Sequence, residues 1–132
     1  MRTKLAFAAA GLGLLLASVP AIAHHSFAAE FDAAKPIKLT GSVTKVEWMN
    51  PHTYFYIDVK DEKGTVTNWG LEMGSPNGLM RQGWTRNSMK IGDVVTVEGS
   101  AAKDGSNIGN ARSVTLSGGQ RLFAGSSQTT NP

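Results

Sequence analysis

The sequence has no cysteine among its 132 residues. The protein therefore forms no disulfide, offers no thiolate to a metal and has no cysteine to carry a lipid anchor. Its longest apolar run, from Leu5 to Val19, covers 15 residues, fewer than the about 20 that a membrane-spanning helix needs. The composition thus excludes thiol chemistry and gives no support for a permanent membrane span.

Catalytic signatures are missing as well. The sequence has no Gly-x-Ser-x-Gly motif, no phosphate-binding loop, no His-Glu-x-x-His motif and no dinucleotide fingerprint. Its carboxylates, among them Glu30, Asp32, Glu47 and Glu72, show no spacing that identifies an acid and base pair. The sequence therefore gives no reason to propose a particular enzyme, and it favours a binding protein.

What the N-terminus does have is the layout of a secretory signal. Arg2 and Lys4 precede the apolar run, and the small residues Ala21 and Ala23 follow it. We expect residues 1–23 to be removed, so that His24 begins a soluble periplasmic or secreted protein. Processing also changes the charge balance, because Arg2 and Lys4 are lost and no acidic residue is.

The formal charge of the whole chain is +3, from 13 basic and 10 acidic side chains, and its pI is near 9.4. Removal of two basic side chains leaves 11 basic and 10 acidic side chains. A nearly neutral domain lacks the basic footprint of a protein that binds a phosphate backbone. We therefore expect no nucleic-acid partner and, after signal cleavage, no membrane association; the sequence identifies no protein partner.

Period-two alternation predicts a single β domain over residues 37–123, after an N-terminal lead-in of residues 24–36 and before a flexible tail of residues 124–132. A change of phase between Val43 and Val46 predicts a β-bulge in the first strand. The predicted strands cover residues 37–48, 52–60, 65–73, 94–99 and 107–116.

Ser75 and Pro76 predict a short helix between strands three and four, which Gly83 ends. Three strands, a helix and two strands indicate an all-β fold, a small five-stranded OB-like Greek-key barrel, with a small sandwich as the alternative. Phe55, Ile57 and Val59 should point into the core, and Trp48, Trp69 and Trp84 are also assigned to it. The opposite face of the second strand then carries His52, Tyr54, Tyr56 and Asp58.

Several motifs together resemble a known family. They are Ala-His24-His25-Ser26-Phe27 after the signal, Glu47-Trp48-Met49-Asn50-Pro51-His52, Gly83-Trp84, and Ile91-Gly92-Asp93-Val94-Val95-Thr96-Val97. With these the chain resembles small exported bacterial proteins catalogued as domain of unknown function 6152, over nearly all of residues 23–123. The resemblance implies export, one β domain and attention to His24, His25 and His52, and it implies no reaction.

The chain has three histidines, His24, His25 and His52, and these are the candidate metal ligands. Cleavage before His24 would give that residue a free amine beside its imidazole. If these two nitrogens meet the ring of His52, they form the T-shaped arrangement called a histidine brace, which favours tetragonal Cu(II). Zn(II), a less favoured ion here, can use the three histidines and a water.

Two other interpretations of the histidines stay open. The amine, the backbone nitrogen of His25 and the His25 ring can chelate copper without any fold. Alternatively, His24 and His25 merely follow a cleavage site, and His52 caps a turn. In either metal-binding mode the amine, with a pKa of about 7.7 to 8, and the imidazole, with a pKa near 6.5, must lose protons. The affinity for the metal should therefore decrease as the pH decreases.

A different candidate site has no metal. Tyr54 and Tyr56 lie on the outer face of the second strand, with Asn68 and Trp48 as possible neighbours, and this surface of OB-folds binds oligonucleotides and oligosaccharides. The ligand would be a periplasmic oligosaccharide, a peptide or a partner protein. Ordinary cross-strand packing of the two rings is the competing interpretation.

Overall fold

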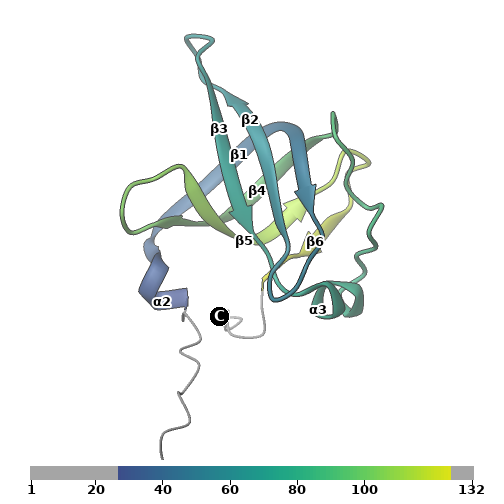
Figure 1. Cartoon of the computed structure of the whole chain (residues 1–132). Helices are drawn as coiled ribbons and strands as arrows, with labels where there is room; N and C mark the ends of the chain where they lie inside the picture. The colour runs from purple at the N-terminus through teal and green to yellow at the C-terminus, as the bar shows by residue number, and fades with distance from the viewer. Residues whose placement is uncertain (1–26, 126–132) are drawn as a thin grey trace, which may run out of the picture.

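The computed structural model describes residues 27–125 and is all-β with little helix (Figure 1). Its described part contains two short helices and six strands. The elements in chain order are α2 (Phe27–Glu30), β1 (Phe31–Glu47), β2 (Tyr54–Lys60), β3 (Val66–Glu72), α3 (Pro76–Arg81), β4 (Val94–Ala102), β5 (Ile108–Thr115) and β6 (Arg121–Phe123).

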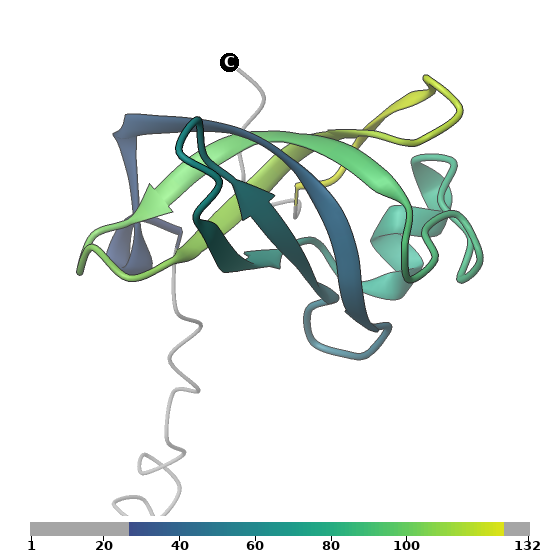
Figure 2. The ribbon, with the colours of Figure 1, turned by 90° about the horizontal axis from the view of Figure 1, so that it is seen from above.

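The strands form one sheet in the order β3-β2-β1-β4-β5-β6, with antiparallel neighbours. One further pairing is parallel and joins β3 to β5, with Gly70 opposite Ile108 and Glu72 opposite Asn110. Figure 2 shows β1 curving along its length, which lets it pair with β4 over its first part and with β2 over its last part.

The predicted bulge in β1 is confirmed. The register with β2 shifts between Val43 and Lys45, which leaves Thr44 as the extra residue. Close to it, a Cβ atom on Gly41 would lie 2.3 Å from the carbonyl oxygen of Asp58, so only glycine lets the two strands approach this closely. The bulge moves the side chains after Thr44 to the other face, as the change of phase in the sequence indicates.

β1 begins at Phe31, whereas the sequence pattern placed the strand start at Ile37. Phe31 pairs with Ala102, and the register with β4 shifts between Asp32 and Pro36. In this first part β1 pairs with β4 alone, and a proline is tolerated in a strand that has only one neighbour. The prediction was wrong here because it treated Pro36 as the end of the lead-in.

A second difference lies near the end of the described residues, where the sequence predicted five strands in all and residues 27–125 form six. The three residues of β6 pair with β5, Leu122 opposite Val114, after a turn in which the N–H of Leu116 donates to Gln120 O at 2.8 Å. The helix between strands three and four is present as α3. The Ser75 hydroxyl accepts from the N–H of Gly78, which is the N-cap that the sequence indicates.

The core lies between the curved strands and α3. Its largest fully buried side chains are Phe55, Ile57, Leu71, Met73, Leu79, Val43, Val95, Val97 and Val114. Of the three tryptophans assigned to the core, only Trp84 is buried, and its indole N–H donates to Phe123 O at 2.9 Å. Trp48 and Trp69 are partly exposed and pack against the core from its edge.

Candidate functional site

His52 lies in the loop between β1 and β2, two residues before β2 begins. Two backbone hydrogen bonds attach the end of this loop to the chain after β3. The N–H of Thr53 donates to Gly74 O at 3.0 Å, and the N–H of Met73 donates to Thr53 O at 2.8 Å. The loop lies beside α3 in both views of the ribbon (Figures 1 and 2). These contacts fix the backbone on which the His52 ring stands.

The His52 ring contacts two acceptors through one nitrogen. Nδ1 lies 3.0 Å from the carbonyl oxygen of Met73 and 3.3 Å from Oε1 of Glu72, and the His52 side chain is 32% exposed. A carbonyl and a carboxylate only accept hydrogen bonds, so the neutral ring carries its hydrogen on Nδ1. The lone pair of the neutral ring is then on Nε2.

Glu72 joins His52 to Tyr54. Glu72 and Tyr54 are register partners on β3 and β2, and the Tyr54 hydroxyl donates to Oε2 of Glu72 at 3.1 Å. The Glu72 side chain is only 12% exposed. Burial raises the pKa of the Glu72 carboxyl, against the opposing effects of His52 and of the Tyr54 hydrogen bond. Burial and the neighbouring Glu72 carboxylate raise the pKa of Tyr54 to about 12.

Glu30, the last residue of α2, is electrostatically connected to the same cluster. Its negative charge contributes to the raised pKa of both Glu72 and Tyr54. Lys103 holds α2 in place, because its backbone N–H donates to Glu30 O at 2.9 Å and its Nζ donates to Ala28 O. Figure 1 shows α2 and the β1–β2 loop on the same, lower side of the molecule.

Of the three predicted metal ligands, one lies among the described residues. His24 and His25 lie outside the described residues, so the structure places only His52. Within residues 27–125, no group of three histidine, aspartate or glutamate side chains is arranged to hold a metal ion. The described cluster of His52, Glu72, Tyr54 and Glu30 would therefore need donors from elsewhere to complete a metal site.

The second candidate surface is the outer face of β2 and β3. Tyr56 lies opposite Gly70, and a Cβ atom on Gly70 would be 3.1 Å from Cε1 of the Tyr56 ring. Lys45 reaches across from β1, with Nζ 5.4 Å from the ring centroid and 2.5 Å from Oε1 of Glu47. Tyr56 therefore rests against the sheet over a residue without a side chain.

Asn68 is on this face and makes three hydrogen bonds. Its amide group donates to Oδ1 of Asp58 at 2.9 Å, to Oγ1 of Thr44 at 3.2 Å and to Ile57 O at 3.3 Å. Trp48, in contrast, packs against the core. The structure thus places Tyr54, Tyr56 and Asn68 along one face of the β2–β3 hairpin.

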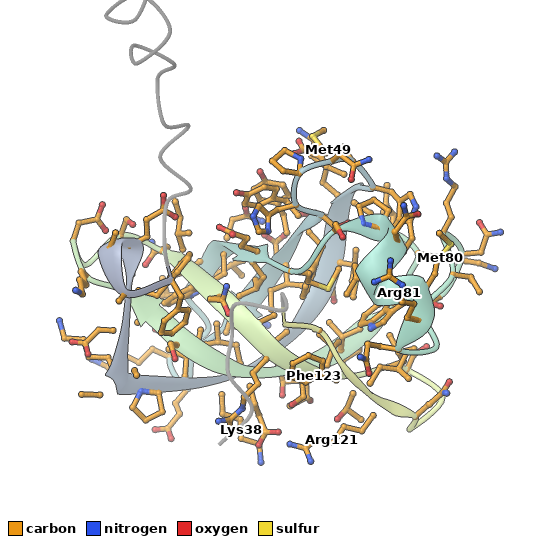
Figure 3. All side chains as sticks on the ribbon, turned by 90° about the horizontal axis from the view of Figure 1, so that it is seen from below. Lys38, Met49, Met80, Arg81, Arg121 and Phe123 are labelled. Carbon is orange, nitrogen blue, oxygen red and sulfur yellow. The ribbon has the colours of Figure 1, made fainter. Side chains whose placement is uncertain are left out.

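Figure 3 shows how the β1–β2 loop and α3 lie relative to the opposite edge of the fold. There Met49 of the β1–β2 loop lies on the same side as Met80 and Arg81 of α3, and Lys38 and Arg121 lie at the opposite edge. At that opposite edge Arg121 donates to Oε2 of Glu98 at 2.7 Å. Glu98 therefore has hydrogen-bond donors other than those of the His52 cluster, namely Ser113 and Arg121.

Sequence reasoning did not assign Glu72 or Glu30 to a site. The alternation along β3 puts Asn68, Gly70 and Glu72 on the outer face, so the sequence contained a signal that Glu72 and Tyr54 share a face. The pairing register, which places them directly opposite each other, is visible only in the structure. For Glu30 no local signal exists, because Glu30 and Glu72 are far apart in the sequence and only the tertiary fold lets the charge of one act on the other.

The fold and this cluster define an all-β protein with an imidazole, a carboxylate and a phenol linked at one end of a β-hairpin. The family model of a family of unknown function, DUF6152, matches residues 11–112. The chain belongs to this family. None of the described residues forms a helix with the length and hydropathy required to cross a membrane.

A comparison with curated proteins gives no match. Among solved structures, the chain is similar to the mitochondrial single-stranded DNA binding protein Rim1 of S. cerevisiae, at 12% identity and a TM-score of 0.49, over 62% of this chain and 92% of that one. It is also similar to a ZRD-deleted mutant of TiaS in complex with agmatine, at 23% identity and a TM-score of 0.48. That similarity covers 76% of this chain and 25% of TiaS.

Proposed function

We propose that the protein is an exported, soluble binding protein of the periplasm or the medium that holds Cu(II) for carriage or sequestration. The ligands in this proposal are the amine and the imidazole of His24, which signal cleavage would expose, and Nε2 of His52. Copper heads the affinity order of the divalent ions and prefers tetragonal sites with nitrogen donors, which is why copper is preferred here to zinc.

The observation that carries the proposal is the hydrogen bonding of His52. Metal-binding histidines almost always donate their second ring N–H to a carbonyl or a carboxylate, which fixes the tautomer and the direction of the ligating nitrogen. Nδ1 of His52 has both kinds of acceptor, Met73 O at 3.0 Å and Glu72 Oε1 at 3.3 Å. Nε2 is thereby the nitrogen with a lone pair for an ion.

The position of α2 supports a contribution from His24. Phe27 begins α2, and three residues of extended chain span at most about 10 Å. Glu30, at the other end of α2, acts electrostatically on Glu72 and Tyr54. Glu30 and His52 thus act on the same Glu72 carboxyl, one from α2 and one from the β1–β2 loop, and the proposal takes His24, three residues before Phe27, as the further ligand.

The proposal includes the finer fold. We infer an OB-like Greek-key barrel, because β1 pairs with β2 and β4, β3 with β2 and β5, and β4 with β5. These pairings connect five strands in a ring, and β6 is an addition outside it. In OB-folds the surface of strands two and three carries the ligand, and here Tyr54, Glu72 and Tyr56 occupy that surface.

Cu(II) titration of three proteins tests the metal proposal. They are the processed chain beginning at His24, the same chain extended by the three N-terminal residues Met-Gly-Gly, and the processed His52→Ala variant. We expect the extension and the loss of His52 each to weaken Cu(II) binding by more than about 100-fold, since even outer-shell changes cost 10- to 100-fold. Tyr56→Phe is the matched control and should bind as the wild type does.

The outcome also separates the two copper modes. If His25→Ala abolishes Cu(II) binding and His52→Ala leaves it unchanged, the ion is held by the N-terminal peptide alone and the proposal is wrong. Affinity should decrease as the pH falls from about 8 to about 6, because the amine and imidazole nitrogens become protonated.

A second candidate function is the binding of a periplasmic oligosaccharide, peptide or partner protein to the Tyr54 and Tyr56 surface. The observation in its favour is that Gly70 leaves room for the Tyr56 ring to rest on the sheet, beside Lys45 and the Asn68–Asp58 pair. Binding of glycan fragments that is lost in Tyr56→Ala and kept in the extended chain would support this function and count against copper.

A further inference from the structure

We propose that one end of the molecule, formed by α3 and the residues after it, binds reversibly to the surface of a membrane that contains anionic lipids. This α3 end consists of residues 76–92 and of Met49 in the β1–β2 loop. The inference is independent of the copper proposal, because none of these residues is a proposed metal ligand.

The charged side chains of the α3 end are all positive. Between Glu72 and Asp93 the sequence contains three cations, Arg81, Arg86 and Lys90, and no carboxylate. The rest of the processed chain has 8 basic and 10 acidic side chains. The nearly neutral total, on which the expectation of no membrane association rests, is therefore the sum of a cationic end and an anionic remainder.

These three cations are available to an external anion. All of them are exposed. Among residues 27–125 the ion pairs use Lys45, His52 and Arg121, and none uses a cation of the α3 end. Asp93, the nearest carboxylate in the sequence, accepts from the backbone N–H of Lys90 at 2.9 Å and forms no ion pair with its ammonium group. The positive charge of this end is thus not neutralised by the described part of the chain.

Exposed apolar side chains gather at the same end. Six large hydrophobic side chains are exposed in the described residues, and three of them belong to the α3 end, namely Met49 at 48%, Met80 at 51% and Ile91 at 74%. A fourth, Val94, follows two residues after this end and begins β4. Apolar side chains that are exposed together among polar residues mark sites of interaction with a protein or a membrane.

The fold brings these residues to one side of the molecule. In both ribbon views α3 and the chain between α3 and β4 lie at the side away from α2 (Figures 1 and 2). Met49 comes from a different loop, and Figure 3 shows it on the same side as Met80 and Arg81. The cations and the apolar side chains can therefore meet one surface together.

Two turns hold the remaining residues of this end outward. Residues 85–88 form a turn closed by a backbone hydrogen bond of 3.1 Å, and Arg86 is an exposed residue within it. Residues 90–93 form a second turn, closed at 3.0 Å, and Ile91 is exposed within that one. The N–H of Gly92 donates to a carbonyl of β1 at 2.8 Å. The second turn is thus attached to the sheet.

A membrane surface fits this arrangement better than a protein surface does. The exposed apolar side chains stand on three separate projections, which are the β1–β2 loop, α3 and the turn of residues 90–93. Each can enter a soft lipid interface without a matching pocket. The core of a protein interface is depleted of charged residues, whereas binding to anionic lipid combines apolar burial with lysine and arginine near the head groups.

Sedimentation with lipid vesicles tests the proposal. The probes are vesicles of phosphatidylcholine alone and vesicles of equal parts phosphatidylcholine and phosphatidylglycerol. The protein is the processed chain, which lacks the apolar run from Leu5 to Val19 that would itself bind lipid. The measured quantity is the partition coefficient of each variant at low and at high salt.

Two matched pairs of variants separate the α3 end from the rest of the surface. In the first pair, a triple variant of the α3 end is compared with a triple variant that loses the same charge elsewhere. These are Arg81→Gln/Arg86→Gln/Lys90→Gln and Lys35→Gln/Lys60→Gln/Lys63→Gln, and all six side chains are exposed. The second pair is Met80→Ser/Ile91→Ser and its control Val66→Ser/Ile108→Ser, in which the control side chains are 55% and 45% exposed.

We expect the wild type to bind the anionic vesicles and to stay off those of phosphatidylcholine alone. Each cation near the surface contributes about fivefold, so the triple variant of the α3 end should bind roughly 100-fold more weakly and the lysine control by less than about threefold. Met80→Ser/Ile91→Ser should lose about tenfold, and Val66→Ser/Ile108→Ser should bind as the wild type does. High salt should weaken the binding of the wild type, because it screens the head-group charge.

Three results would overturn the inference. The first is a wild type that does not bind anionic vesicles at low salt, which would leave an acidic protein as the partner of this end. The second is an equal loss in the two triple variants, since total charge alone would then explain the attraction. The third is binding that needs the cations but not Met80 and Ile91. None of these results changes Cu(II) binding through His52, so the proposed function would stand or fall separately.

Discussion

Thr53, the residue after His52, offers a sharp test of the packing around the site. Its side chain is 0% exposed, and its hydroxyl has no hydrogen-bond partner in the described part of the chain. A buried hydroxyl without a partner costs about 1–3 kcal/mol. Valine has the same shape with a methyl group in place of the hydroxyl, so Thr53→Val removes this cost without opening a cavity.

We expect Thr53→Val to increase the free energy of unfolding by about 1–2 kcal/mol. For a domain of this size, 1 kcal/mol corresponds to about 4–8 °C in Tm. Urea and thermal denaturation of the metal-free processed protein measure both quantities. Thr53→Ser keeps the hydroxyl and loses a buried methyl group, so it should lower the stability by about 1 kcal/mol.

If Thr53→Val is no more stable than the wild type, the hydroxyl has a partner in solution and the reasoning about its burial is refuted. The β1–β2 loop would then have a different arrangement around Thr53. The contacts of the neighbouring His52 ring would need to be measured again before they could support a ligand role.

Three further predictions follow from the same contacts. Burial raises the pKa of Glu72 above its unfolded value, so the native state binds more protons and stability falls as the pH rises through that pKa. In urea denaturation, the free energy of unfolding of Glu72→Gln relative to the wild type should therefore be higher near pH 7 than near pH 4. A difference between the two proteins that does not depend on pH would contradict this. Gly99→Ala places a Cβ atom 1.8 Å from Asn110 O and should cost at least about 3 kcal/mol, whereas Gly118→Ala, with nothing within 4 Å of the new atom, should change stability by less than about 0.5 kcal/mol. In ultraviolet titration the Tyr54 phenol should ionise at a pKa of about 12, and a late ionisation that persists in Tyr54→Phe would show that another group is responsible.

Local sequence patterns predicted the parts of the fold that depend on local chemistry. The change of phase after Val43 predicted the bulge at Thr44, and Ser75 followed by Pro76 predicted the start of α3. Alternation also predicted the inward direction of Phe55 and Ile57. Each of these features is determined by residues that are close together in the sequence. A single sequence therefore contains the information needed to predict it.

The early start of β1 and the presence of β6 depend on distant partners. Phe31 becomes part of a strand because it lies opposite Ala102, and Leu122 because it lies opposite Val114. A strand of three residues is too short to show a period, and Pro36 gives a local signal against a strand. Pairing across the sheet decided both cases.

The candidate site divides in the same way. Alternation placed Tyr54 and Tyr56 on one outer face, but only the register places Glu72 opposite Tyr54, and only the tertiary fold brings Glu30 near it. The acceptors of His52 Nδ1 come from Glu72, the last residue of β3, and from Met73 after it, about twenty positions along the chain. The contributions of His24 and His25 lie outside the described residues and stay predictions.

The most direct test of the copper proposal is the electron paramagnetic resonance spectrum of Cu(II) on the processed protein, with the intact mass of the same sample. The mass should correspond to a chain that begins at His24. The nitrogen hyperfine pattern should show one nitrogen fewer in His52→Ala than in the wild type. A chain that begins elsewhere, or identical spectra for the two proteins, would contradict the proposal that His24 and His52 hold one copper ion together.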